Sequence, residues 1–186
     1  MNFDYIVMRM TWPATEVLIR MRTMLEPLGW KLLMPETGLV SLYTEDGMDR
    51  LLLTVGDLEA RLSAQGIISF QWWYSSGADL FSHVSKCTDG WTVRFHLDGF
   101  SESEQVSFVR DLYRYATSGG SDFFEFLVYD RLPTDESILS EWSGVTLDNV
   151  MDQPWICGVD LLLVRDANNI LRTVVASELG AEALKN

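Results

Sequence analysis

Short strand-forming segments separated by tight turns are the feature of this sequence that most limits its fold. Residues 39–45 and 48–55 flank Asp46-Gly47, a dipeptide that supplies the positive φ angles of a two-residue type I′ hairpin. In this register two apolar residues of each segment lie opposite each other: Val40 with Leu53 and Leu42 with Leu51. Both pairs fall on one face, so the segment predicts an antiparallel hairpin with one buried side.

The same alternation of strand and turn continues through most of the chain. Ser75-Ser76-Gly77 and Asp89-Gly90 separate three runs rich in β-branched and aromatic residues. These runs predict three consecutive antiparallel strands. Including them, the expected strands outside the first hairpin are Asp4–Met10, Ile67–Tyr74, Ala78–Cys87, Trp91–Asp98, Asp122–Tyr129, Ile156–Val164 and Ile170–Val175.

Helical periodicity is confined to a few segments between the strands. Apolar residues recur at steps of three and four after Pro13, and this pattern ends at Pro27 and Gly29. Ser101 and Glu104 have the spacing of a capping box before a second apolar stripe, which Gly119-Gly120 ends. Two shorter helices are expected over Asp57–Ala64, closed at Gly66, and from Glu178 to the C-terminal end.

These elements together predict an α+β fold, mostly antiparallel sheet with helices packed on it. Hydrophobic residues make up 47% of the 186 positions and aromatic residues 12%, which favours a folded core over disorder. We expect a single domain over 1–186, with a possible subdivision into 1–66 and 67–186.

The chain is strongly acidic, with 27 Asp and Glu against 14 Lys and Arg and a formal net charge of -13. A surface of this sign repels nucleic acid and anionic membrane, so direct binding to either is not expected. The acidity has two interpretations: it keeps a hydrophobic-rich protein in solution, or it forms a face for a charged partner. Charge alone leaves both open.

No motif for a cofactor, metal or nucleophile is present in the sequence. GxSxG, GxxxxGK[ST], GxGxxG and DxDxDG patterns are all missing, and Cys87 and Cys157 lie outside any CxxC or Cys-His cluster. We therefore expect no cofactor and no metal, and two free thiols. The first residues do not resemble a secretory signal and no apolar run is long enough for a bilayer, which predicts a cytoplasmic protein.

Two histidines form the one pair with a motivated catalytic role. If Asp89-Gly90 is a two-residue turn, His83 stands directly opposite His96 across the hairpin. Two imidazoles at that distance can act as general acid and base on a phosphoester, or hold a metal with Asp98 or Cys87. Ordinary sheet histidines are the alternative.

A candidate partner-binding surface combines aromatic and acidic residues. Trp72 and Trp73 are adjacent in a strand and must face opposite sides, so one ring is exposed, covered by the acidic loop after Tyr129, or packed under a helix on the far face. The long segment after Tyr129 is rich in carboxylates. The predicted partner-binding residues are Trp72, Trp73, Asp130, Asp135, Glu136, Asp148 and Asp152.

This surface suits a basic protein partner, through a desolvated aromatic anchor and electrostatic steering. In composition the chain resembles small acidic immunity proteins, which implies tight one-to-one pairing with a cognate bacterial toxin. The leading hypothesis is a non-enzymatic antitoxin. The alternatives are a phosphoester-acting enzyme that uses His83 and His96, and an adaptor or structural subunit.

Overall fold

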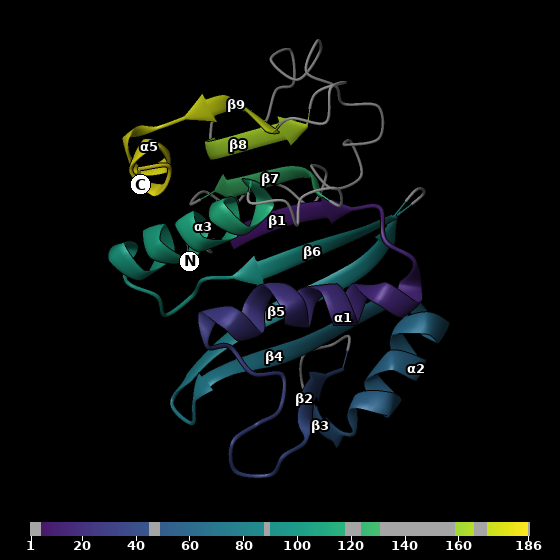
Figure 1. The fold of residues 1–186 in the computed structure, drawn as a ribbon. Helices are drawn as coiled ribbons and strands as arrows, with labels where there is room; N and C mark the ends of the chain where they lie inside the picture. Colours follow the sequence, from purple (N-terminus) through teal and green to yellow (C-terminus); the bar gives the residue numbers. More distant parts are fainter. Residues whose placement is uncertain are drawn as a thin grey trace. The chain divides into compact units, whose positions relative to one another are not determined.

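The computed structural model describes residues 5–44, 49–87, 90–117, 124–130, 159–165 and 171–185 (Figure 1). The described residues form antiparallel sheet with helices, so the predicted α+β class is confirmed. The chain divides into two units: unit 1 comprises Met1–Thr11 and His96–Asn186, and unit 2 comprises Trp12–Phe95.

Strands of unit 2 follow the order β3-β2-β4-β5-β6. Their bounds are β2 (Val40–Tyr43), β3 (Arg50–Leu53), β4 (Ile67–Ser75), β5 (Ala78–Cys87) and β6 (Gly90–His96), the last residue of which is assigned to unit 1. The hairpin prediction is confirmed residue by residue, because Val40 pairs with Leu53 and Leu42 with Leu51. The three consecutive strands that the turn dipeptides predict are also present.

One face of this sheet is mostly apolar and is buried along the middle of β4 and β5. Alternate residues of β4 and β5 point to it and have at most 4% of their surface exposed: Ile68, Phe70, Trp72, Leu80 and Val84. The helices of unit 2 bury an apolar stripe of their own, and α2 (Val55–Gln65) contacts both α1 (Ala14–Leu25) and β4. We call this side of the sheet the core face.

Helix ends in unit 2 follow from local sequence. The α1 helix begins after Pro13 and passes into a 3₁₀ turn, η1 (Glu26–Leu28), that ends at Gly29 with φ 92°, as the sequence predicts. The α2 helix is longer than expected, because the Thr54 hydroxyl accepts the Asp57 N–H while the Asp57 carboxylate accepts the Thr54 N–H. The Thr54-x-x-Asp57 spacing is the capping signal that places the start of α2 two residues before the expected one at Asp57.

Unit 1 contains the strand order β1-β7-β8-β9 in its described part. The bounds are β1 (Tyr5–Met10), β7 (Phe124–Asp130), β8 (Val159–Arg165) and β9 (Leu171–Ala176), with helices α3 (Glu102–Thr117) and α5 (Glu178–Ala183). Because β1 pairs along its length with β7, the N-terminal strand groups with the C-terminal part of the chain. The single domain over 1–186, with its possible subdivision into 1–66 and 67–186, stays a prediction.

One detail of unit 1 matches a sequence expectation, and a second feature is seen only in the structure. Ser101 and Glu104 form the predicted capping box, with the Ser101 N–H donating to Glu104 Oε2 at 2.7 Å and the Glu104 N–H donating to Ser101 Oγ at 3.4 Å. The α3 and α5 helices contact each other, and Arg110 Nη2 donates to the Glu182 carbonyl at 3.0 Å. The predicted helix stop at Gly119-Gly120 lies outside the described residues.

Candidate functional site

The second face of the unit 2 sheet, opposite the core face, carries a mixture of polar, aromatic and aliphatic side chains. Directly paired residues of antiparallel strands point to the same side, so the register defines its members. We call it the relay face; it consists of Ser41, Tyr43, Arg50, Leu52, Ile67, Ser69, Gln71, Trp73, Asp79, Phe81, His83 and Ser85.

A chain of hydrogen bonds crosses this face from a cation to an anion. Arg50 Nε donates to Ser41 Oγ at 2.7 Å, and Ser41 Oγ donates to Gln71 Oε1 at 2.9 Å. Gln71 Nε2 then donates to Asp79 Oδ2 at 2.5 Å. Every group donates in the same direction, so the relay is polarised from the guanidinium on β3 to the carboxylate on β5.

The middle of the relay is buried and its two ends are exposed. Ser41 is 0% exposed and Gln71 8% exposed, whereas Arg50 and Asp79 are exposed residues. The guanidinium of Arg50 is fixed further by the Trp73 ring, whose centroid lies 5.4 Å from Cζ, and by Met34 Sδ, to which Nη2 donates. Hydrogen bonds to the buried Ser41 and Gln71 side chains therefore hold the two charged ends in place at the surface.

A half-open cavity of about 700 Å³ lies where β2 and β4 meet the end of α2. Its wall includes His83 and Ser69, which are directly paired across β4 and β5 and joined by a hydrogen bond of 2.9 Å between Ser69 Oγ and His83 Nδ1. The complete lining is Leu42, Tyr43, Thr44, Asp49, Arg61, Gln65, Ile67, Ile68, Ser69 and His83.

The histidine pair proposed from the sequence stays a prediction, because His83 belongs to unit 2 and His96 to unit 1. Within unit 2, Ser85 Oγ and Thr92 Oγ1 lie 2.6 Å apart, and β5 ends at Cys87 while β6 begins at Gly90. The predicted turn would instead place Ser85 opposite Arg94. Both observations fit a pairing shifted by two residues from the predicted one.

Both tryptophans of the predicted partner site are buried. Trp72 is 0% exposed on the core face, and Trp73 is 7% exposed on the relay face beneath Arg50. Neither ring is exposed, so of the alternatives left open by the sequence the buried one applies to both, and their role in partner binding stays a prediction. The exposed aromatic is the next residue, Tyr74, at 62%.

The acidic members of that predicted site are mostly beyond the described part of the chain. Asp130 is the last residue of β7 and pairs with Tyr5 on one side and Val159 on the other. Asp135, Glu136, Asp148 and Asp152 lie outside the described residues. Their role in partner binding remains a prediction.

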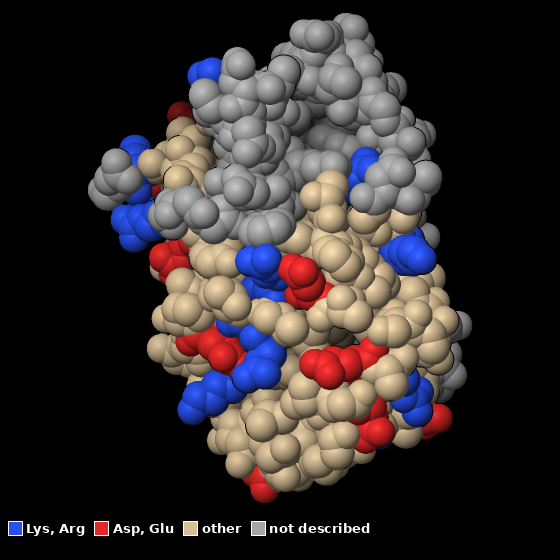
Figure 2. Space-filling model, turned by 45° about the vertical axis from the view of Figure 1, so that its right-hand side comes forward, with Lys and Arg blue, Asp and Glu red and all other residues tan. Residues whose placement is uncertain are grey.

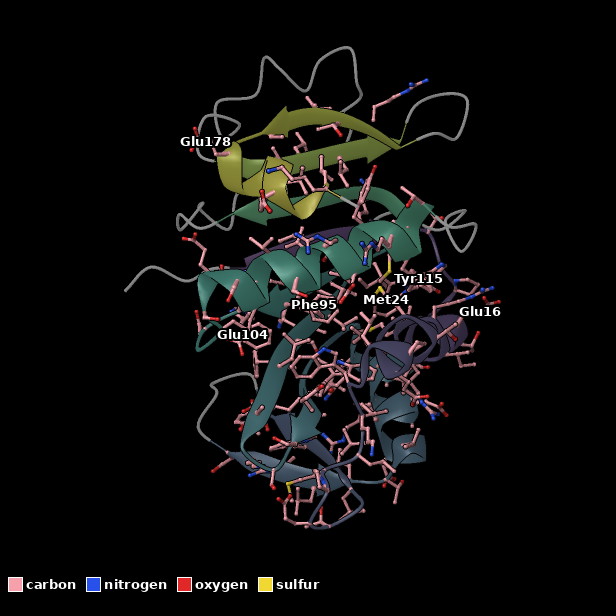
Figure 3. All side chains as sticks on the ribbon, turned by 60° about the vertical axis from the view of Figure 1, so that its left-hand side comes forward. Glu16, Met24, Phe95, Glu104, Tyr115 and Glu178 are labelled. Atoms are coloured by element: carbon pink, nitrogen blue, oxygen red, sulfur yellow. The ribbon has the colours of Figure 1, made fainter. Side chains whose placement is uncertain are left out.

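Three exposed carboxylates in the described part have lowered pKa values. Hydrogen bonds from Ser101 lower the pKa of Glu104, which is labelled in Figure 3, and hydrogen bonds from Thr54 lower the pKa of Asp57. A hydrogen bond and the charge of Lys185 lower the pKa of Glu182. Each carboxylate is held ionised by a local partner in its own helix end.

Charge is divided unequally between the units. Unit 1 has 17 Asp and Glu against seven Lys and Arg, a net charge of -10, and unit 2 has 10 against seven, a net charge of -3. On the face shown in Figure 2, red and blue side chains of the described residues are interspersed. Most of the excess acidity therefore lies in the unit that contains residues 130–152.

Across the described ranges, no group of three or more His, Cys, Asp or Glu side chains is arranged to hold a metal ion. Among the helices described, none combines the length and apolar character needed to cross a bilayer.

Comparisons with known proteins give a single weak likeness to report. No protein-family model and no curated protein matches the chain. A solved structure, the toxic C-terminal tip of CdiA from Pseudomonas aeruginosa in complex with immune protein, is similar over 72% of this chain and 88% of that chain, with 13% sequence identity and a TM-score of 0.41. At this similarity the match carries no argument about function.

Proposed function

We propose that the chain is an acidic binding protein that captures a basic protein partner through unit 1 and neutralises it, as an immunity protein does with a bacterial toxin. The observation that carries this proposal is the uneven division of charge, -10 in unit 1 against -3 in unit 2. An acidic coat that serves only solubility has no need to favour one unit.

The physical argument is electrostatic steering. A concentrated negative field attracts a positively charged surface and raises the rate of encounter, and this effect weakens as salt screens it. Proteins that act on nucleic acid need basic clefts for the phosphate backbone, so a nuclease toxin is the class of partner that such a field suits best. Covering the basic cleft would block its activity.

The test is affinity capture from the native cell at low and moderate salt, with two charge-reversal variants of equal charge change. We expect the wild-type chain to retain one basic protein in a one-to-one ratio. Asp135→Lys with Glu136→Lys, in unit 1, should weaken its retention. Glu36→Lys with Glu59→Lys, two exposed changes in unit 2, is the matched control.

Neutralisation needs its own measurement. Expression of the captured protein alone should stop growth, and co-expression of this chain should restore it. Equal loss of binding in both variants would show that net charge alone matters, and retention that does not depend on salt would contradict the steering argument.

A hydrolytic enzyme is the second candidate, and one observation favours it. Ser69 Oγ and His83 Nδ1 are 2.9 Å apart in the wall of the cavity, the separation of a nucleophile and its base. Hydrolysis of ester or phosphoester substrates that is lost in both Ser69→Ala and His83→Ala would support this candidate. Turnover that survives Ser69→Ala would remove it.

A further inference from the structure

The relay face combines exposed apolar area with charges in fixed positions. Leu52 is 43% exposed and Ile67 is 46% exposed. Tyr43 and Phe81 are in edge-to-face contact, with ring centroids 5.4 Å apart. Aromatic residues, exposed aliphatic side chains and an ordered arginine are the composition of protein interfaces, where Tyr and Arg supply much of the binding energy.

The two ends of the relay carry opposite charges on opposite sides of the face. Arg50 lies on β3 and Asp79 on β5, and the order β3-β2-β4-β5 separates these strands by three inter-strand spacings. At about 4.8 Å for each spacing, the strands are roughly 14 Å apart. The face is therefore a dipole, with its cation and anion at a set separation.

Such a face is complementary to itself. A two-fold axis in the plane of contact, perpendicular to the relay and through its midpoint, exchanges the two ends. A second copy turned about this axis presents its Asp79 to Arg50 and its Arg50 to Asp79. The apolar and aromatic side chains of the two copies then meet between two ion pairs.

We infer that the relay face is the contact surface of a symmetric homodimer, with a second copy of this chain as its occupant. The relay explains why Ser41 and Gln71 are polar at buried positions: they orient the two charged groups before contact, which lowers the entropic cost of binding. Long-range repulsion between two acidic copies is smallest here, because unit 2 has a net charge of only -3.

The test is analytical ultracentrifugation of the purified chain over a concentration series, with a charge exchange between the two ends. We expect the wild type to dimerise reversibly. Arg50→Asp and Asp79→Arg should each weaken the dimer about tenfold or more, because each creates two like-charge contacts. The double variant, with the charges exchanged, should regain most of the affinity.

An apolar variant keeps the test decisive if the charge changes disturb folding. Leu52→Glu places a charge on the exposed part of the relay face and should also give a monomer, whereas Ile19→Glu, at a position 55% exposed on α1, should leave the dimer intact. Thermal unfolding of each variant identifies any loss of fold.

Three results would overturn the inference: a wild type that is monomeric throughout, a Leu52→Glu variant that dimerises normally, or a folded double variant that stays monomeric. A monomer that still captures a basic protein would sink the dimer and leave the proposed function standing. The two ideas therefore fail separately.

Discussion

Units 1 and 2 divide the chemistry of the chain between them. Unit 1 holds 17 of the 27 acidic residues, and unit 2 holds five of the seven tryptophans, Trp12, Trp30, Trp72, Trp73 and Trp91. A binding site predicted from the sequence joined Trp72 and Trp73 with acidic residues of 130–152, and so drew on both units. The difference indicates that tryptophan is concentrated in unit 2 and acidic charge in unit 1.

The largest expected effect tests the core of unit 2. Trp72→Ala removes a fully buried ring from the core face and should lower the free energy of unfolding by about 3–5 kcal/mol. Urea unfolding followed by tryptophan fluorescence, which reports mainly on unit 2, measures the change. Ile19→Ala, at an exposed position, should stay within about 0.5 kcal/mol. A small effect of Trp72→Ala would mean that unit 2 does not depend on its aromatic core.

A second prediction separates the two faces of the same sheet. Gln71→Leu leaves the buried Ser41 hydroxyl without its acceptor, and should cost about 1–3 kcal/mol of unfolding free energy. Ser41→Ala with Gln71→Leu should cost less than the sum of the two single changes, because both belong to one network. Additive costs in urea unfolding would show that the relay does not act as a unit.

Local structure could be predicted from the sequence where neighbouring residues decide it. The hairpin register predicted from the Asp46-Gly47 dipeptide is confirmed in β2 and β3, Gly29 and Gly66 end their helices with positive φ angles, and Ser101 with Glu104 begins α3. Each signal lies within a few residues of the element that it defines. The register predicted from Asp89-Gly90 does not match as closely, because the contact between Ser85 and Thr92 fits a pairing shifted by two residues.

The candidate site could not be predicted in the same way, because its contacts join residues far apart in sequence. Ser41 meets Gln71 across 30 positions, and nothing in either local segment indicates the partner. Trp73 lies beneath Arg50, which reaches it from another strand. The adjacent Trp72 and Trp73 in β4 place one ring on each face of the strand, but the sequence does not identify the residues that cover them.

Matched helix caps compare the stability of the two units directly. Thr54→Ala in unit 2 and Ser101→Ala in unit 1 each remove a capping hydroxyl and should cost about 1 kcal/mol. If the units unfold together, calorimetry gives one transition that both variants shift. If they unfold separately, Thr54→Ala should shift one transition and Ser101→Ala the other.

The smallest expected effect is the acid dependence of the same two caps. The folded pKa of Glu104 lies below its ordinary value of 4.5 and that of Asp57 below 3.8, so each ionised carboxylate stabilises the fold. This contribution is complete above the ordinary pKa and is lost as the pH falls through the lowered one. The stability difference between wild type and Ser101→Ala should therefore begin to shrink just below pH 4.5, and the difference for Thr54→Ala only below pH 3.8. Urea unfolding from pH 7 to pH 3 measures both differences, and a difference that grows on acidification would contradict the assignment of these caps.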